Sequence, residues 1–285
     1  MLKTMLLTFL ALVAFAANSV LCRLALNDNI IDAASFTSIR LLSGAIFLLF
    51  LVYVKTKKTL AMKAGTWKNA FYLFIYAVAF SYAYISLDTG AGALILFGSV
   101  QTTMIIFNFM KGQKLSIFEW AGLIVALSGL LVLLLPGASA PSLSGFIIMT
   151  LSGIAWGLYT LAGRGATSPV ANTASNFVRT IPFILVLTIF TFDSTQTSNE
   201  GIMLAILSGA IMSGLGYAIW YSALTHLSIT QASTLQLIVP IMAAFGGVIF
   251  LNELITTQLV ISSALVLGGV LVVTLCKPKK SVSTS

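Results

Sequence analysis

Long apolar runs, each close to the length of a membrane-spanning helix, alternate along the chain with short polar segments. A transmembrane helix needs about 20 mainly apolar residues. The longest uncharged stretch, Trp120 to Gly163, is too long for one helix, and Pro136 and Gly137 supply a turn midway. The pattern therefore predicts an all-α integral membrane protein with ten transmembrane helices. The expected spans are 4–22, 33–54, 69–87, 90–110, 118–135, 143–163, 172–192, 201–224, 230–251 and 256–276.

The charged residues between these spans are distributed asymmetrically. With ten spans, alternate loops lie on the same side of the membrane; one set holds twelve basic residues, and the other holds Arg23 and six acids. Cytoplasmic loops are enriched in Lys and Arg, and one missed span would exchange every later loop between the two sets. The asymmetry therefore favours ten spans with both termini in the cytoplasm. Glu119 is the one acid that falls on the side of the twelve basic residues. The basic residues are Lys3, Lys55, Lys57, Lys58, Lys63, Lys68, Lys111, Lys114, Arg164, Lys277, Lys279 and Lys280, and the acids are Asp28, Asp32, Asp88, Asp193, Glu200 and Glu253.

Composition indicates the same class of protein. Hydrophobic residues make up 59% of the chain and charged residues 8%, with a mean hydropathy of +1.05, whereas a soluble domain carries about 25% charged residues. So few ionisable groups cannot cover a water-exposed surface, and most of this surface faces the lipid bilayer. The net charge of +8 is spread between apolar runs, which argues against a nucleic-acid partner. The first run is too long for a cleavable signal peptide, and the low acid count suits a bacterial inner membrane.

The second half of the sequence resembles the first at an offset of 139 to 141 residues. A single match means little in so apolar a chain, but four matches in the same order indicate a duplication. We expect the first repeat at residues 1–136 and the second at 137–285. The matches pair Phe15-Ala16 and Arg23 with Trp156-Gly157 and Arg164, Arg40 with Arg179, residues 112–116 with 252–256, and residues 127–131 with 267–271.

The duplication has a topological consequence. Because each repeat has an odd number of spans, the second copy enters the membrane inverted relative to the first. Inverted repeats are common among secondary transporters, whose substrate site lies near the midplane at the repeat interface. Two copies that exchange conformations open such a site to one side and then to the other. We therefore expect two inverted five-helix repeats around a central cavity, and ten helices are enough for a complete pathway in a monomer.

The second repeat carries a distinctive set of residues: Trp156-Gly157, Arg179, Pro240 in mid-span, Asn252-Glu253 and a Gly-rich last helix. With these residues the chain resembles, over nearly its whole length, the drug/metabolite transporter superfamily, specifically its EamA-type members. The resemblance implies two domain copies at about 6–135 and 145–275, with ten spans and cytoplasmic termini. It also implies a cavity lined mainly by the first, third, fourth, sixth, eighth and ninth helices, and the export or exchange of amino acids, other metabolites or drugs. The first copy departs from the pattern at Phe15-Ala16, Val100 and Gln113.

Two arginines, Arg40 and Arg179, lie about seven residues inside their expected spans. A charge near the bilayer centre costs ~2.5–3.5 kcal/mol on insertion scales, so such residues usually face the protein interior or a water-filled cavity. One interpretation is that both flank the cavity and attract an anionic group of the substrate. The other is structural: each caps carbonyl groups, reaches an interface, or pairs with an acid such as Glu253.

Isolated amides inside the spans are further candidates for substrate binding. Gln101 lies near the middle of the fourth span and Gln236 at a comparable place in the ninth, while Asn18 and Asn176 lie in the first and seventh. Their side chains can hydrogen-bond a substrate's amine or carboxylate, or they can join helices to one another.

Aromatic residues gather in the third, sixth and eighth spans. Trp156 and Tyr217 lie deep in their spans, whereas Tyr82 lies near the outer end of the third. Tyr and Trp can line an amphipathic pocket, and they also form belts at membrane interfaces. The candidate substrate-binding residues are therefore Gln101, Trp156, Arg179, Arg40, Tyr217, Gln236, Tyr82 and Asn18.

The sequence lacks metal-ligand clusters, a phosphate-cradling loop and a nucleophile–base constellation, so we expect no cofactor, no metal and no enzymatic activity. The favoured function is a secondary transporter that moves an amino acid or a similar amphipathic metabolite by alternating access, in efflux or exchange. Two alternatives remain open. One is an efflux transporter for drugs or quaternary ammonium compounds, and the other is a membrane channel or scaffold subunit.

Overall fold

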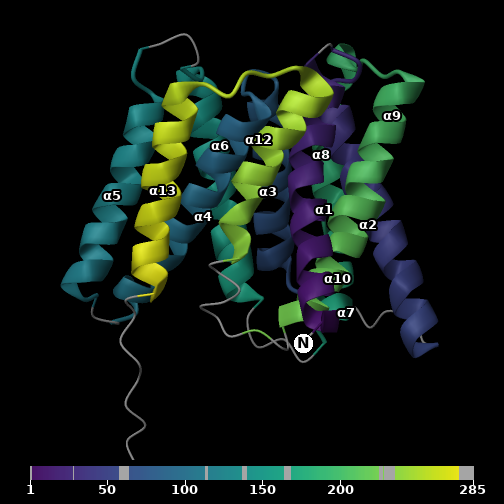
Figure 1. The fold of residues 1–285 in the computed structure, drawn as a ribbon. Coiled ribbons are helices and arrows are strands. Elements are labelled where there is room, and N and C mark those ends of the chain that lie inside the picture. The colour runs from purple at the N-terminus through teal and green to yellow at the C-terminus, as the bar shows by residue number, and fades with distance from the viewer. Residues whose placement is uncertain are drawn as a thin grey trace, which may run out of the picture.

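The computed structural model describes residues 2–27, 29–57, 64–112, 115–136, 140–163, 168–224, 227 and 235–275. These residues form a bundle of helices (Figure 1). Among them, seven helices are long and apolar enough to cross a membrane, and two more are shorter apolar helices. The structure therefore confirms the predicted class, an all-α protein with several helices that can cross a membrane.

The first half of the chain forms five helices with well-defined starts. They are α1 (Leu2–Asn27), α2 (Ala33–Thr56), α3 (Trp67–Tyr84), α4 (Thr89–Met110) and α5 (Ile117–Leu133). Polar side chains cap three of their N-termini, since Asp32, Thr66 and Ser116 each accept a backbone N–H from the first turn. Glu119 completes a capping box with Ser116, which explains how an acid can be buried at this helix end.

The second half forms the remaining helices. They are α6 (Leu143–Ala162), α7 (Pro169–Arg179), α8 (Ile181–Thr191), the 3-10 turn η2 (Phe192–Ser194), α9 (Asn199–Ile206), η3 (Leu207–Leu215), α10 (Gly216–Leu224), α12 (Ile238–Leu251) and α13 (Thr257–Leu275). α9, η3 and α10 follow one another without a break, so they form one long helix.

The expected single span at 172–192 is interrupted. α7 ends at Arg179 and α8 begins at Ile181, with Thr180 between them. Pro182 explains the break, because its ring lacks an N–H donor and clashes with the carbonyl of the residue four positions earlier. The Thr180 hydroxyl donates to Phe177 O at 2.6 Å and satisfies one of the carbonyls at the break.

The eighth and ninth expected spans also differ in detail from the structure. η3 is π-helical, which hydropathy did not predict, and such segments are frequent at functional sites. In the ninth span, residues 228–234 lie outside the described part. α12 begins at Ile238, so Pro240 lies in its first turn rather than in mid-helix.

The helices of the two halves pack against one another in a regular way. α6 packs against α3 and α4, whereas α1 packs against α9–η3–α10 and α12. The first helix of each half therefore packs against the third and fourth helices of the other, if α7–α8 and α9–η3–α10 are each counted as one. α5 packs against α13. Gly153 allows the close approach of α6 and α4, since an added Cβ would lie 2.5 Å from Ser99 Cβ.

The outward faces of the bundle carry large apolar side chains. Phe190 is 84% exposed, and Ile46, Leu131 and Ile249 are exposed in the same way on other helices. A soluble protein rarely exposes so many apolar side chains together. The outer surface of the bundle therefore fits a lipid environment.

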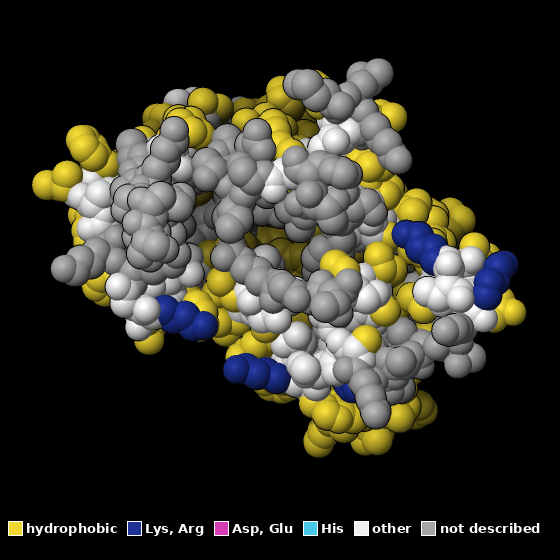
Figure 2. Space-filling model, turned by 90° about the horizontal axis from the view of Figure 1, so that it is seen from below, with side chains coloured by type: hydrophobic (Ala, Val, Ile, Leu, Met, Phe, Trp, Pro, Cys, Tyr) yellow, Lys and Arg dark blue, Asp and Glu magenta, His cyan; other side chains and the backbone are white. Residues whose placement is uncertain are grey.

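The two ends of the bundle differ in charge. α1 begins and α13 ends at the same end (Figure 1), and Lys and Arg side chains lie around the rim of that end, with no acid among the side chains coloured there (Figure 2). We call it the basic end and the opposite one the acidic end. Basic residues at helix termini of the basic end are Lys55, Lys57, Lys68 and Lys111, and described acids at the acidic end are Asp32, Asp88, Asp193, Glu200 and Glu253.

Candidate functional site

A small cavity lies inside the bundle, between the two halves of the chain. Its volume is about 20 Å³, room for about one water molecule. Both halves contribute to its wall, α1, α3 and α4 from the first and α6, η3 and α10 from the second. The lining residues are Phe15, Asn18, Ser19, Tyr76, Phe80, Leu96, Phe97, Trp156, Met212, Ser213 and Tyr217.

Aromatic rings form most of the cavity wall. The centroid of the Trp156 ring lies 4.7 Å from that of Tyr76 and 5.1 Å from that of Tyr217. Phe15 contacts Tyr217 edge-on at 6.0 Å, and Phe80 lies 5.6 Å from Tyr76. Such rings offer flat apolar surface together with Tyr O–H and Trp N–H groups. The wall is therefore amphipathic.

Arg40 of α2 borders this cavity through residues of its wall. Its side chain is buried, with a relative exposure of 1%. Its Nη2 donates to the Tyr76 hydroxyl at 2.9 Å and its Nε to Ser213 Oγ at 3.4 Å. The guanidinium carbon lies 4.8 Å from the Phe80 ring centroid and 5.3 Å from that of Tyr76. Ring contacts and neutral hydroxyls thus hold the charge in place.

The charge of Arg40 has no acidic partner in the described part of the chain. Its Nη1 is buried and has no hydrogen-bond partner there. The ion pairs found among the described residues are those of Arg23 with Asp88 and Glu253. The interpretation that Arg40 pairs with Glu253 is therefore wrong. A buried cation without a counter-charge is costly, and positions that retain one are functional candidates.

Asn18 joins α1 to the π-helical segment beside the cavity. Its Oδ1 accepts a hydrogen bond from Ser208 Oγ at 2.5 Å, and both side chains are buried. The next residue, Gly209, lies against the carbonyl oxygen of Arg40, where no Cβ would fit. α1, α2 and η3 are thereby held together around the guanidinium.

Gln101 is a second buried polar side chain without a partner. It is 4% exposed, and its Nε2 makes no hydrogen bond to a described residue. It lies four residues after Phe97, on the same face of α4 as this cavity-lining residue. It therefore lies one turn from the cavity towards the basic end.

The structure places the other candidate residues away from the cavity wall. Arg179 ends α7, where its Nη1 donates to Ser175 Oγ and its guanidinium carbon lies 5.8 Å from the Trp67 ring centroid. Tyr82 and Gln236 are partly buried and do not line the cavity. The cavity thus brings together Asn18, Trp156 and Tyr217, with Arg40 at its edge and Gln101 one turn away.

Sequence reasoning missed eight of the eleven lining residues, among them Tyr76 and Ser213, the hydrogen-bond partners of Arg40. Tyr76 precedes Phe80 by one helical turn, a spacing that places both on one helix face. The third span is one of the aromatic-rich spans, so this spacing could have identified Tyr76. Ser213 had no comparable signal, because its alignment with Arg40 depends on how η3 packs against α2.

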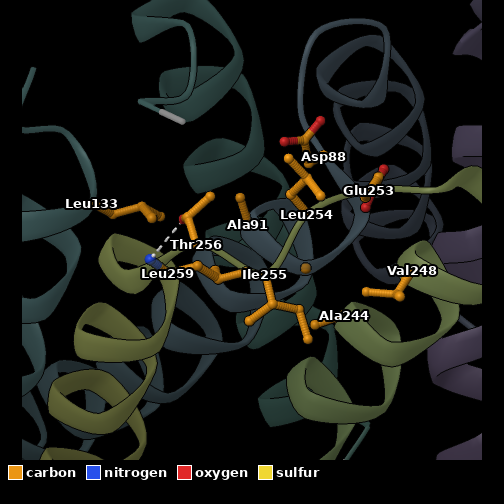
Figure 3. Close-up of a pocket in the computed structure, with 11 residues that line it drawn as sticks. Asp88, Ala91, Leu133, Ala244, Val248, Glu253, Leu254, Ile255, Thr256 and Leu259 are labelled. Carbon is orange, nitrogen blue, oxygen red and sulfur yellow. Dashed lines mark hydrogen bonds between the residues drawn. The ribbon is translucent and has the colours of Figure 1, made fainter. Parts of the chain in front are cut away.

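A network of polar contacts closes the acidic end. Both carboxylate oxygens of Glu253 accept the backbone N–H of Thr89, at 3.0 and 2.9 Å, and Oε1 also accepts the Thr89 hydroxyl at 2.9 Å. Glu253, in the segment between α12 and α13, thus caps α4, whose own N-cap residue Asp88 makes no capping bond. Figure 3 shows Glu253 in this segment and Asp88 before α4, both in the wall of a pocket.

Arg23 completes this network, which we call the acidic-end clamp. Its Nη1 donates to Tyr84 O and Ile85 O at 3.0 and 3.1 Å. Its Nε lies 3.5 Å from Glu253 Oε1, and its Nη2 lies 3.6 Å from Asp88 Oδ1. The clamp therefore joins α1, α3 and α4 to the segment before α13. A hollow of about 360 Å³ lies outside it at the surface.

Glu253 lies outside the membrane-spanning segments, and its pKa is shifted. Burial raises the pKa of its carboxyl above the ordinary value of 4.5, and hydrogen bonds from the backbone N–H and the hydroxyl of Thr89 lower it. Asp88 raises this pKa further, while Arg23 lowers it. The burial effect dominates, so the clamp favours the protonated carboxyl more than water does.

A second contact at the acidic end joins the two halves. Asp32 Oδ2 accepts the backbone N–H of Gln196 at 2.9 Å, and Asp32 N donates to Gln196 O at 2.9 Å. Ile31 and Thr197 form an isolated antiparallel bridge beside it. Two separate sets of hydrogen bonds therefore join the two halves at the acidic end.

Comparisons with known proteins agree with this architecture. The EamA-like transporter family matches residues 2–135 and again residues 143–275. The uncharacterized protein PA1977 of Pseudomonas aeruginosa is 48% identical over 268 residues, 94% of this chain and 93% of its own. A Salmonella typhimurium protein named as a probable amino-acid metabolite efflux pump is 22% identical over 209 residues, 68% of this chain and 70% of its own. One solved structure, at 17% identity, matches 95% of this chain and 97% of its own with a TM-score of 0.67, which concerns the fold alone.

The helical bundle, its lipid-compatible surface and its internal cavity define the class as a multi-pass helical membrane protein. Within this class, the chain belongs to the EamA-like transporter family. The resemblance noted in the sequence is confirmed. Membership implies a small-molecule substrate and a bilayer environment.

Proposed function

We propose that the chain is a secondary transporter that carries a small organic metabolite across the membrane by alternating access. In this proposal residues 1–136 and 137–285 are two inverted five-helix repeats around the central cavity. The paired family matches at 2–135 and 143–275 support the division. The reciprocal packing of α1 and α6 on the third and fourth helices of the other half supports the pseudo-symmetry.

The observation that carries the proposal is the composition of the cavity wall. Elements of both halves meet there, and two buried polar atoms that lack partners among the described residues lie beside the wall, Arg40 Nη1 and Gln101 Nε2. A protein interior usually satisfies its buried polar groups, so unsatisfied ones at a junction between halves favour a ligand site. Midplane sites at repeat interfaces are typical of transporters with inverted repeats.

The proposed orientation places the basic end in the cytoplasm. Lys55, Lys57, Lys68 and Lys111 support this orientation through the enrichment of basic residues on the cytoplasmic side. The acidic end then faces outward, and the clamp of Arg23 and Glu253 is the outer gate in its closed state. For a chain with close bacterial relatives, the corresponding membrane is the bacterial inner membrane.

An amphipathic metabolite fits the rings and polar groups of the wall. The Salmonella typhimurium relative, named for amino-acid metabolite efflux, supports efflux or exchange of an amino acid or similar solute. A monomer contains both halves of the proposed pathway. Two competing functions are efflux of quaternary ammonium drugs, which the aromatic rings favour, and a channel or scaffold role.

Counterflow in proteoliposomes tests the proposal. Vesicles are preloaded with one unlabelled solute from a panel of amino acids and organic acids, and the uptake of the same labelled solute is followed. An exchanger accumulates label transiently above equilibrium, whereas a channel only equilibrates it. We expect such an overshoot for at least one solute, and its loss in Trp156→Ala but not in Lys111→Gln, at the exposed basic end. Equilibration without overshoot across the panel would contradict transport by exchange.

A further inference from the structure

We propose that the ligand of the central cavity is an organic monocarboxylate with an apolar or aromatic body, and that its carboxylate binds Arg40. The inference rests on the proposed function and narrows its substrate from amphipathic metabolites in general, zwitterionic amino acids included, to monocarboxylates. It also decides between a carboxylate, a zwitterion and a quaternary ammonium compound as the occupant.

The geometry of the guanidinium is the first ground for this assignment. Arg40 uses Nη2 and Nε on Tyr76 and Ser213, while the buried Nη1 offers two N–H donors that no described residue accepts. Because Tyr76 and Ser213 both line the cavity, the guanidinium lies directly behind its wall, bonded to two of the lining side chains. Arginine binds carboxylates through short, charge-assisted hydrogen bonds, and these are stronger than bonds to neutral acceptors.

The charge balance is the second ground. The titratable side chains with an electrostatic effect on Arg40 are Tyr76, Tyr217 and Cys22, all of which are ordinarily uncharged at neutral pH. The site therefore carries a net charge of about +1 before a ligand enters. A monocarboxylate cancels that charge, whereas a zwitterionic amino acid leaves it in place and brings an ammonium group that finds no described acid. A quaternary ammonium ion would double the charge in a buried space.

The walls beyond Arg40 favour an apolar body on the ligand. Phe80, Phe97 and Trp156 present rings, and Met212 presents a flexible thioether. Asn18 is already bonded to Ser208. The guanidinium behind the wall is thus a buried cation with unused donors toward the described residues, and the ring and thioether surfaces suit rings or alkyl groups.

The cavity has to widen before such a ligand fits, since its present volume suits one water molecule. η3 provides a place for this change. It carries Met212 and Ser213, and it has the less common π-helical form within an otherwise α-helical segment. A shift of η3 away from α2 would release Ser213 from Arg40 and free a second donor, Nε, for the carboxylate.

Calorimetric titration of the purified full chain in detergent tests the inference with four probes of similar size. They are phenylacetate, phenylacetamide, L-phenylalanine and phenyltrimethylammonium, in chloride-free buffer so that a small inorganic anion does not occupy the site. Because charge-assisted bonds exceed neutral ones, we expect phenylacetate to bind at least about tenfold more tightly than the amide. The zwitterion should bind like the amide, and the ammonium ion should not bind. Equal affinity for acid and amide, or tighter binding of the ammonium ion, would overturn the inference.

Variants locate the carboxylate on Arg40. Arg40→Gln should lose the preference for phenylacetate over phenylacetamide, and Arg40→Lys should keep part of it. Lys111→Gln removes the same charge at the exposed basic end and should keep all of it. If none of the probes binds the wild type, a panel of aliphatic and aromatic monocarboxylates replaces them. The inference is overturned when no carboxylate in that panel gives a signal that Arg40→Gln removes.

Two outcomes separate this inference from the transport proposal. Carboxylate binding that depends on Arg40, without counterflow of the same carboxylate, would keep the anion site and overturn transport. Counterflow of a cationic solute that survives Arg40→Gln would keep transport and overturn the anion site.

Discussion

Truncation of Glu253 should open the acidic end of the bundle. Glu253→Ala removes the carboxylate that caps α4 and pairs with Arg23, but it leaves the apolar wall of the central cavity intact. In the proposed transport cycle this carboxylate belongs to the outer gate of the pathway. The variant should therefore shift the protein from the outward-closed towards the outward-open state.

The magnitude follows from the hydrogen bonds that are lost. Thr89 is fully buried, and its N–H is one of the first four of α4, which have no partner within the helix. A buried donor without an acceptor costs about 1–3 kcal/mol. Water from the surface hollow offsets part of this cost, which places the effect in the lower half of the range. The ratio of open to closed molecules should therefore rise roughly 5- to 30-fold.

Thiol labelling measures this shift. Cys22 and Cys276 are first replaced by Ser, and Ser19→Cys then serves as the reporter, since Ser19 lines the cavity and is only 1% exposed. A membrane-impermeant reagent is added to the acidic-end side of oriented vesicles. The labelling rate should increase with Glu253→Ala by the factor given above.

Glu200→Ala is the matched control, because Glu200 is an exposed acid at the same end of the bundle. It removes the same charge without a buried partner and should leave the labelling rate unchanged. The clamp would have no gating role if Glu253→Ala left the rate at the wild-type value. A gating role would be refuted equally if Glu200→Ala raised the rate as much as Glu253→Ala.

Other predictions concern the pH dependence of the clamp and the packing around the cavity. Because the pKa of Glu253 is raised in the closed clamp, protonation of its carboxyl stabilises the closed state, and this stabilisation is fully present below about pH 4.5 and is lost as the pH rises through the shifted value. Since only the thiolate reacts, the reporter's labelling rate is divided at each pH by that of a small free thiol; the quotient should be lower near pH 5 than near pH 7.5, and Glu253→Gln should remove this dependence. Gly209→Ala places a methyl group against a backbone carbonyl of α2 and should lower stability by about 1–3 kcal/mol, whereas Gly268→Ala, with no neighbouring atom within 4 Å, should not lower the melting temperature. Asn18→Ala leaves the buried Ser208 hydroxyl without its acceptor and should cost about 1–3 kcal/mol in thermal unfolding.

The positions of the helices follow from the sequence to a large extent. Hydropathy and loop charge predicted where most helices begin and end within a few residues, because a bilayer fixes the length of a spanning helix. Hydropathy did not predict the break at Thr180, because a hydropathy window treats Pro182 like any other weakly polar residue. The π-helical form of η3 has no local sequence signal and depends on its contacts with α1 and α2.

The side-chain partners of the site were harder to predict. An arginine inside a span implies an inward-facing charge, and Arg40 is indeed buried. Its partner Ser213 lies 173 residues away in the sequence, and Glu253 lies 164 residues from Thr89. Such pairs depend on helix packing, which periodicity does not encode. For the same reason nothing in the sequence favoured pairing Glu253 with Arg23 rather than with Arg40 or Arg179.

Labelling of the Ser19→Cys reporter from both sides of the membrane, with and without Glu253→Ala, tests alternating access most directly. If one cavity opens to one side at a time, the variant should raise the labelling rate from the acidic-end side and lower it from the basic-end side in the same preparation. A rate that rises from both sides together would mean a continuous channel. A reporter that reacts from one side only, in every variant, would likewise contradict a transporter with a shared central site.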